Sequence, residues 1–100
     1  MLVHSFSTHL TFINDPGHGW LKGPLTDIAA LGIEAQITPY SFIEEQYAYL
    51  EEDLDAPHYL EALTTQGLPQ PEITDQYVER FPRDKDRFTH DLAFWNHLRS

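Results

Sequence analysis

The sequence predicts an α+β domain: a small antiparallel sheet of four to five strands with two or three helices packed on one face. Two observations lead to this prediction. Segments with strand-like alternation and segments with helix-like spacing follow one another in the order strand, strand, helix, strand, strand, helix. The 100 residues are 41% hydrophobic and 13% aromatic, which favours a single folded domain over residues 1–100 rather than an acidic disordered tail.

The first two strands are expected to form a hairpin. Residues 2–13 alternate with a period of two and carry β-branched and aromatic side chains, as a half-buried strand does. Residues 14–17, with the sequence Asn-Asp-Pro-Gly, combine residue types that each favour a turn. Residues 18–22 would then return beside the first strand as a short second strand.

A short helix is predicted next, over residues 24–31. A proline at its start suits the first turn of a helix, and Gly32 stands where a left-handed C-terminal cap belongs. The helix is too short to be stable alone, so it must pack on the sheet. Residues 37–43 and 46–51 are expected to form two more strands on either side of a pair of glutamates.

The second helix is expected to begin near Asp53 or Asp55, because either aspartate can cap its N-terminus. It should run to about Gln66 and stop at Gly67, the residue type favoured in a left-handed cap. Leu68 then supplies the hydrophobic contact that commonly follows such a cap.

The last third of the chain, residues 69–100, is expected to form a C-terminal arm followed by a helix. Two prolines interrupt the chain at residues 69–71, and residues 73–81 form either a fifth strand or an extended arm. Residues 84–98 have helical spacing, with apolar side chains along one stripe and acids in the first turn.

Positive charge is missing from the middle of the chain. The 57 residues between Lys22 and Arg80 contain twelve carboxylates and no lysine or arginine, and the formal net charge of the chain is -10. Such a surface attracts cationic partners. It disfavours direct binding to nucleic acid or to an anionic membrane, because their phosphates carry the same sign of charge. The expected partner is therefore a basic protein.

Several functional classes lack a signal in this sequence. The chain has no cysteine, which excludes disulfides, thiolate metal sites and cysteine nucleophiles. No serine stands in a nucleophile-elbow context, and no glycine motif completes a phosphate loop. We therefore expect neither an enzyme nor a cofactor. The start of the chain lacks the features of a signal peptide, and no apolar run could span a bilayer, so a cytoplasmic location is expected.

The strongest candidate for a functional surface is the acidic cluster at residues 51–55. It has three interpretations: helix capping, contact with a basic partner, and binding of a divalent metal. Capping and partner contact are compatible with each other. The acidic face expected to contact a partner consists of Glu44, Glu45, Glu51, Glu52, Asp53, Asp55 and Glu61.

Two aromatic residues are further candidates for partner contact. Trp20 stands between glycine and leucine, and it is either an exposed anchor in a binding loop or a core residue. Tyr49 belongs either to an interaction face or to the packing of the sheet. Among six histidines, His18 and His58 are the candidates for a metal site, to be completed by a carboxylate.

Four cations gather shortly before the C-terminus, beside two acids. This segment is either the solvated start of a helix or a basic arm that docks on the acidic body of its own or a neighbouring chain, which would give a homodimer. The four cations are Arg80, Arg83, Lys85 and Arg87.

A series of short motifs runs in order through the first two thirds of the chain. HGW occupies residues 18–20, LGI residues 31–33, YSF residues 40–42 and YLEED residues 49–53. Together they resemble a family of small uncharacterised proteins found in bacteriophages and bacterial mobile elements. The match covers about residues 18–67. The resemblance implies a phage or mobile-element origin and carries no activity with it.

The expected function is that of an acidic protein-binding module, encoded by a phage or mobile element, that blocks a basic, nucleic-acid-binding site on a host or defence protein. Its carboxylates would stand in for phosphates, and its association would be fast and sensitive to salt. Two alternatives stay open. One is a small metal-binding domain or hydrolase that uses histidines and carboxylates, and the other is a structural homodimer.

Overall fold

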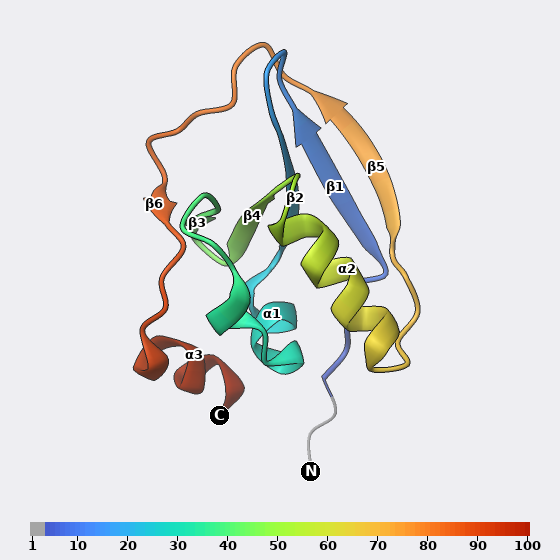
Figure 1. The fold of residues 1–100 in the computed structure, drawn as a ribbon, viewed down its shortest axis with the longest axis vertical. Helices are drawn as coiled ribbons and strands as arrows, with labels where there is room; N and C mark the ends of the chain where they lie inside the picture. Colours follow the sequence, from blue (N-terminus) through green and yellow to red (C-terminus); the bar gives the residue numbers. More distant parts are fainter. Residues whose placement is uncertain (1–3) are drawn as a thin grey trace.

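Six strands form one sheet in the computed structural model, which describes residues 4–100, and three helices pack with it (Figure 1). The strand order is β5-β1-β2-β4-β3-β6. The strands are β1 (His9–Asn14), β2 (Gly19–Pro24), β3 (Phe42–Glu44), β4 (Tyr47–Glu51), β5 (Glu72–Tyr77) and β6 (Asp86–Arg87). The helices are α1 (Leu25–Leu31), α2 (Asp55–Thr65) and α3 (Leu92–Arg99), with a 3-10 turn over Glu34–Gln36.

The α+β class is confirmed, with a sheet that is larger than expected and mixed. β5 runs parallel to β1, whereas the other strand pairs are antiparallel. The parallel pair follows from the position of α2, which carries the chain from the end of β4 back to the end of the sheet where β1 begins (Figure 1). Within the described residues, no helix is long and apolar enough to cross a membrane.

The first strand is shorter than predicted. β1 begins at His9, residues 4–8 lie outside the sheet, and the start of the predicted strand, residues 2–3, lies outside the described residues. The segment leaves the sheet because it binds Asp27 of α1 instead. His4 Nε2 lies 2.6 Å from one Asp27 carboxylate oxygen, and the Ser7 N–H donates to the other at 3.2 Å.

The predicted strand over residues 37–43 is reduced to the three residues of β3. Residues before it are drawn away from the sheet by Asp55, whose side chain is 1% exposed. This carboxylate accepts hydrogen bonds from the Thr38 N–H at 3.0 Å, the Thr38 hydroxyl at 2.6 Å and the Ser41 hydroxyl at 2.6 Å. Asp55 is therefore a buried anchor for this loop and neither caps α2 nor belongs to an exposed face.

The N-terminus of α2 is capped by a residue that comes before the predicted ones. The Glu51 carboxylate accepts the N–H groups of Asp53, Leu54 and Asp55, so it satisfies donors that the first turn of a helix leaves free. The C-terminus follows the prediction. Gly67 has a φ of 74°, and the Leu68 N–H donates to the Leu63 carbonyl at 2.8 Å, as in a Schellman motif.

The helix predicted over residues 84–98 begins only at Leu92. Before it, the short strand β6 pairs with β3, because the Phe88 N–H reaches the Ser41 carbonyl at 3.0 Å and holds this segment along the sheet edge. Phe88 and Trp95 are both buried and stack with ring centroids 5.1 Å apart. These two rings fix α3 to the main core.

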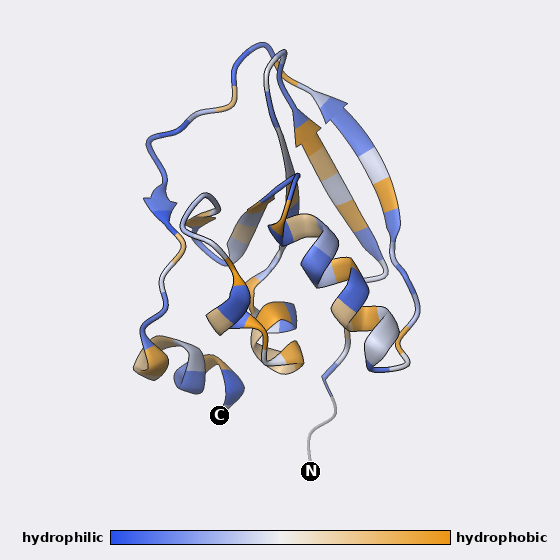
Figure 2. Ribbon diagram, viewed as in Figure 1, coloured by the Kyte–Doolittle hydropathy of each residue, from blue (hydrophilic) through white to orange (hydrophobic). Residues whose placement is uncertain are grey.

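The two faces of the sheet carry two separate cores. Neighbouring strand residues point to opposite faces, so Leu21 and Leu50 join the helices while Trp20 and Tyr49 lie on the other side. Figure 2 shows hydrophobic residues on α1 and β1, whereas β6 is hydrophilic.

The second core is closed by the crossing segment, residues 78–85, which connects β5 to β6 across the sheet face opposite the helices. Phe81 in this segment is 3% exposed and stacks on Trp20 with ring centroids 4.0 Å apart. It also contacts Phe42 and Tyr49, at centroid distances of 6.1 and 5.4 Å. A connection between opposite sheet edges thus becomes the cover of an aromatic core.

The buried position of Asp55 gives a first prediction. Asp55→Ala leaves the Thr38 N–H and the Thr38 and Ser41 hydroxyls without their hydrogen-bond acceptor. We therefore expect a loss of about 3 kcal/mol in the free energy of unfolding. The exposed neighbour variant Asp53→Ala should change it by less than about 0.5 kcal/mol. Urea unfolding of both variants measures the two values, and equal values would contradict the anchoring role of Asp55.

Candidate functional site

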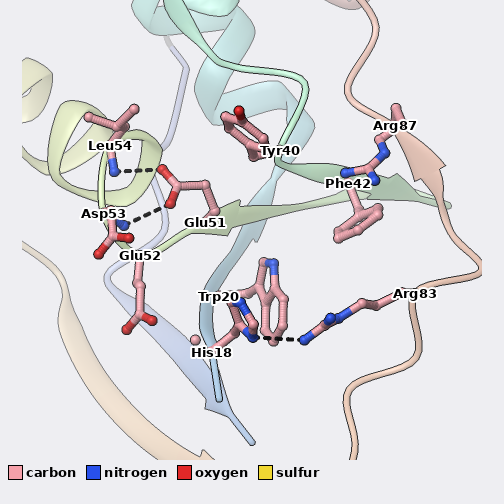
Figure 3. Close-up of a pocket in the computed structure, with 11 residues that line it drawn as sticks. His18, Trp20, Tyr40, Phe42, Glu51, Glu52, Asp53, Leu54, Arg83 and Arg87 are labelled. Atoms are coloured by element: carbon pink, nitrogen blue, oxygen red, sulfur yellow. Dashed lines mark hydrogen bonds between the residues drawn. The ribbon is translucent and has the colours of Figure 1, made fainter.

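A pocket of about 380 Å³ opens at the end of the sheet where β2, the β4–α2 turn and the crossing segment meet (Figure 3). It has an aromatic floor, an acidic rim and a basic rim. The floor consists of Trp20 and Phe42, the acidic rim of Glu52 and Asp53, and the basic rim of Arg83 and Arg87.

The floor exists because of the register of three neighbouring strands. Trp20 of β2 pairs with Glu51 of β4, and Phe42 of β3 pairs with Tyr49 of β4, so these side chains lie on one face. Trp20 is 4% exposed and Tyr49 is 7% exposed. Both follow the core interpretation rather than that of an exposed anchor, although Trp20 also lines the pocket.

The acidic rim is formed by two of the three consecutive acids at the end of β4 and in the turn that follows it. Glu51 turns back to cap the helix, whereas Glu52 and Asp53 are exposed (Figure 3). Among residues 4–100, neither the Glu52 nor the Asp53 carboxylate has a hydrogen-bond or ion-pair partner. Beside them lie two exposed apolar groups, Leu54 with 59% of its surface exposed and Tyr40 with 68%.

The basic rim is formed by two arginines that lie over the aromatic floor. The Arg83 guanidinium stands 5.3 Å from the Trp20 ring centroid and donates to His18 Nδ1 at 2.8 Å. The Arg87 guanidinium stands 4.8 Å from the Phe42 ring centroid and donates to a backbone carbonyl at 3.1 Å. Cation–π attraction and these hydrogen bonds hold both side chains in place while leaving them exposed.

Asp15 fixes the crossing segment to the β1–β2 turn. One carboxylate oxygen accepts the N–H groups of Gly17 and His18, and the other accepts the N–H of Phe81 at 3.1 Å. The Phe81 hydrogen bond is the main reason why the pKa of the Asp15 carboxyl lies below its usual value, and the Arg83 charge lowers it further. This one side chain therefore contacts both the cover of the aromatic core and Arg83 of the basic rim, which lies 3.7 Å away.

The seven acids expected on one face are distributed in several places. Glu52 and Asp53 lie at one end of β4, and Glu44 and Glu45 lie at the other end, roughly 17 Å away for a five-residue strand. Glu44 is paired with Lys85 at 2.6 Å. The remaining three are Glu51 as a helix cap, Asp55 in the interior and Glu61 on the exposed side of α2.

Among residues 4–100, the candidate metal site at His18 and His58 is not found. His18 lies exposed in the β1–β2 turn and accepts a hydrogen bond from Arg83, whereas His58 lies half-buried in α2. Across the described part of the chain, no three histidine, aspartate or glutamate side chains are grouped so that they could hold a metal ion.

The basic C-terminal segment docks on the acidic body of its own chain. The Lys85 side chain is only 9% exposed in its pair with Glu44, and Arg99 makes two hydrogen bonds to Glu34 at 2.8 and 2.9 Å. The Arg99 hydrogen bonds lower the pKa of the Glu34 carboxyl. These contacts use cations that a homodimer would otherwise offer to its neighbour.

Sequence reasoning missed the basic rim and the role of Asp15. The sequence signal for Asp15 was present, because aspartate in an Asp-Pro-Gly turn commonly accepts backbone N–H groups. No local signal placed Arg83 and Arg87 over Trp20 and Phe42, since that contact depends on a chain crossing between opposite edges of the sheet.

No family model, no curated protein and no solved structure matches the chain. The resemblance to bacteriophage and mobile-element proteins therefore stays a prediction. Any function must be inferred from the pocket and the surfaces around it.

The lowered pKa values of Asp15 and Glu34 predict an acid-sensitive fold. A carboxyl with a lower pKa in the folded state stabilises that state above its unfolded pKa of about 4, and the contribution is lost as the pH falls through the folded value. The stability advantage of the wild type over Asp15→Asn should therefore shrink between pH 6 and pH 2. Urea midpoints across this range measure it.

The matched control is Asp84→Asn, which changes the same residue type at an exposed position in the same segment. The difference in urea midpoint between this variant and the wild type should show no comparable dependence on pH. A constant difference between the wild type and Asp15→Asn over the whole range would contradict the role assigned to the Asp15 carboxylate.

Proposed function

We propose that the protein is a non-enzymatic protein-binding module whose pocket takes a cationic side chain of a partner between the acidic rim and the aromatic floor. The observation that carries the proposal is the position of Glu52 and Asp53. They are two exposed carboxylates without a cation of their own, next to a pocket of about 380 Å³. A pocket of this size suits one or two side chains.

The surroundings of the rim favour a protein partner. The exposed side chains of Leu54 and Tyr40 border the same pocket, and tyrosine is enriched in protein interfaces. An arginine of the partner can bond the carboxylates through its guanidinium and cover these apolar groups with its methylenes. The net charge of -10 would speed the encounter with a basic protein.

The basic rim determines which charges the bound segment must carry. Arg83 and Arg87 repel a partner that is cationic over its whole length, so the segment that fits carries a basic residue followed or preceded by an acidic one. The two rims would also fix the direction in which this segment lies across the pocket. The net charge would thus speed the encounter with a basic partner, and the two rims would select which of its segments binds.

The target class that we propose is a basic, nucleic-acid-binding site on a host or defence protein. The net charge and the resemblance to phage and mobile-element proteins support this class. Binding would then block nucleic acid by competition. An electrophoretic mobility assay with a captured basic partner and duplex DNA tests it, because added protein must release the DNA. A ternary complex would contradict competition.

A peptide titration tests the pocket itself. The probe is a capped peptide with one arginine two residues before one aspartate, and its affinity is measured by isothermal titration calorimetry. The double variant Glu52→Gln/Asp53→Asn should weaken binding at least tenfold, which corresponds to about 1.4 kcal/mol or more. Binding of a matched peptide with lysine or arginine in place of the aspartate should be weaker than that of the probe.

The control variant Glu45→Gln/Glu61→Gln removes the same charge at exposed positions away from the pocket. It should change the affinity by less than twofold in 0.15 M salt, because distant exposed charges are screened. Equal weakening by both double variants would show general attraction by the net charge and contradict a pocket-specific contact.

A further inference from the structure

β5 is an edge strand that is exposed along its whole length. All six of its residues, Glu72–Tyr77, are exposed, and within the part of the chain that the structure describes it pairs only with β1. Figure 1 shows it along the outer border of the sheet, with no helix beyond it. Its second edge is therefore accessible.

The backbone groups on this free edge can be identified from the pairing with β1. The Glu72 N–H donates to the Thr8 carbonyl at 2.9 Å, and the Val78 N–H donates to the Asn14 carbonyl at 2.8 Å. Because backbone groups of successive strand residues point to alternate edges, the even-numbered residues bond to β1. The outward donors and acceptors belong to Ile73, Asp75 and Tyr77.

Apart from the charges of Glu72 and Asp75, the usual means of protecting an edge strand are absent from β5. It contains no proline, glycine or lysine, no bulge interrupts its six-residue register with β1, and it is as long as β1. Ile73 and Tyr77 are 42% and 61% exposed, so apolar surface borders the free hydrogen-bonding groups. An edge with these properties is suited to take up a further strand.

The charges on β5 identify the occupant. The strand carries Glu72 and Asp75 and no cation, and Asp75 has no hydrogen-bond or ion-pair partner among residues 4–100. A second copy of the chain would bring four carboxylates together and set two net charges of -10 against each other. Glu72 and Asp75 lie on opposite faces of the strand, so an extended segment with lysine or arginine at alternate positions pairs with Asp75 on one face or with Glu72 on the other.

We propose that the free edge of β5 binds an extended, basic segment of a partner protein by strand addition. The proposal rests on the proposed function only in the sign of the partner's charge. It adds a second contact, through backbone hydrogen bonds of Ile73, Asp75 and Tyr77, which the pocket at Glu52 and Asp53 does not provide.

The test uses a capped synthetic peptide of alternating lysine and valine and measures amide hydrogen exchange by NMR. At saturating peptide, the amides of Ile73, Asp75 and Tyr77 should exchange at least tenfold more slowly, while those of Thr74 and Gln76 should change little. Unchanged exchange at Ile73, Asp75 and Tyr77 would overturn the proposal. A peptide with glutamate in place of lysine should bind at least tenfold more weakly. Equal binding of the two peptides would overturn the inference that the occupant is basic.

Two blocking changes keep the result interpretable. Asp75→Pro removes an outward N–H without touching the hydrogen bonds to β1, so it should leave the fold intact and abolish peptide binding, whereas Asp75→Asn removes the charge alone and should only weaken binding. Gln76→Pro removes an inward donor and should destabilise the fold. If Asp75→Pro fails to fold, the wild-type protein is titrated instead with a peptide whose backbone nitrogens are N-methylated. Such a peptide keeps its side chains and loses its backbone hydrogen-bond donors. Full affinity in either case would overturn strand addition.

Failure of this proposal can be distinguished from failure of the pocket. Glu52→Gln/Asp53→Asn should bind the lysine–valine peptide like the wild type, and Asp75→Pro should bind the arginine–aspartate peptide like the wild type. A different result would be that the protein forms dimers as its concentration rises and that Asp75→Pro abolishes them. That result would assign the edge to a second copy of the chain and overturn the proposal of a basic partner.

Discussion

The hydrogen bond between the Asp15 carboxylate and the Phe81 N–H is the contact on which the candidate site depends. It joins a turn near the start of the chain to a segment 66 residues later, after the chain has completed five strands. Together with the stacking of Phe81 on Trp20 and the contacts of Arg83 and Lys85, it holds the crossing segment against the sheet. Phe81 shields the aromatic floor from water, and the same Asp15 carboxylate lies 3.7 Å from Arg83, which borders the pocket.

The charge of the sequence is a poor measure of the charge available for binding, because the fold uses several carboxylates internally. Asp27 and Asp55 are buried and accept hydrogen bonds from segments far away in the sequence. Glu51 caps α2, and Glu34 is bound by Arg99. A buried carboxylate is stable only when such partners replace its lost water. The acids that remain for a partner are therefore fewer, and they are placed by the turns rather than by a single acidic face.

Local rules predicted the parts of the fold that local chemistry determines. Glycines at positions 32 and 67 mark the ends of α1 and α2 in the structure as they do in the sequence. The strands that are shorter than predicted involve partners distant in sequence: His4 and Ser7 bind Asp27, and Thr38 binds Asp55. The cap of α2 is a local exception, because Glu51 lies two to four residues from the N–H groups that it accepts. The candidate site was predictable to the same extent. Glu52 and Asp53 could be identified from their turn, whereas the arginines opposite them could not.

The arrangement of opposite charges around one pocket has a consequence for selectivity. An all-acidic surface attracts every basic protein, and its affinity falls with salt for all of them alike. At this pocket, Arg83 and Arg87 stand across from Glu52 and Asp53 over rings that exclude water. In the proposed function, a polycation would gain at one rim and lose at the other, so the groups that orient a mixed-sign segment would also discriminate against the polycation. The basic residues near the C-terminus, which reduce the net charge, would thus contribute the selectivity that the acids alone would not have.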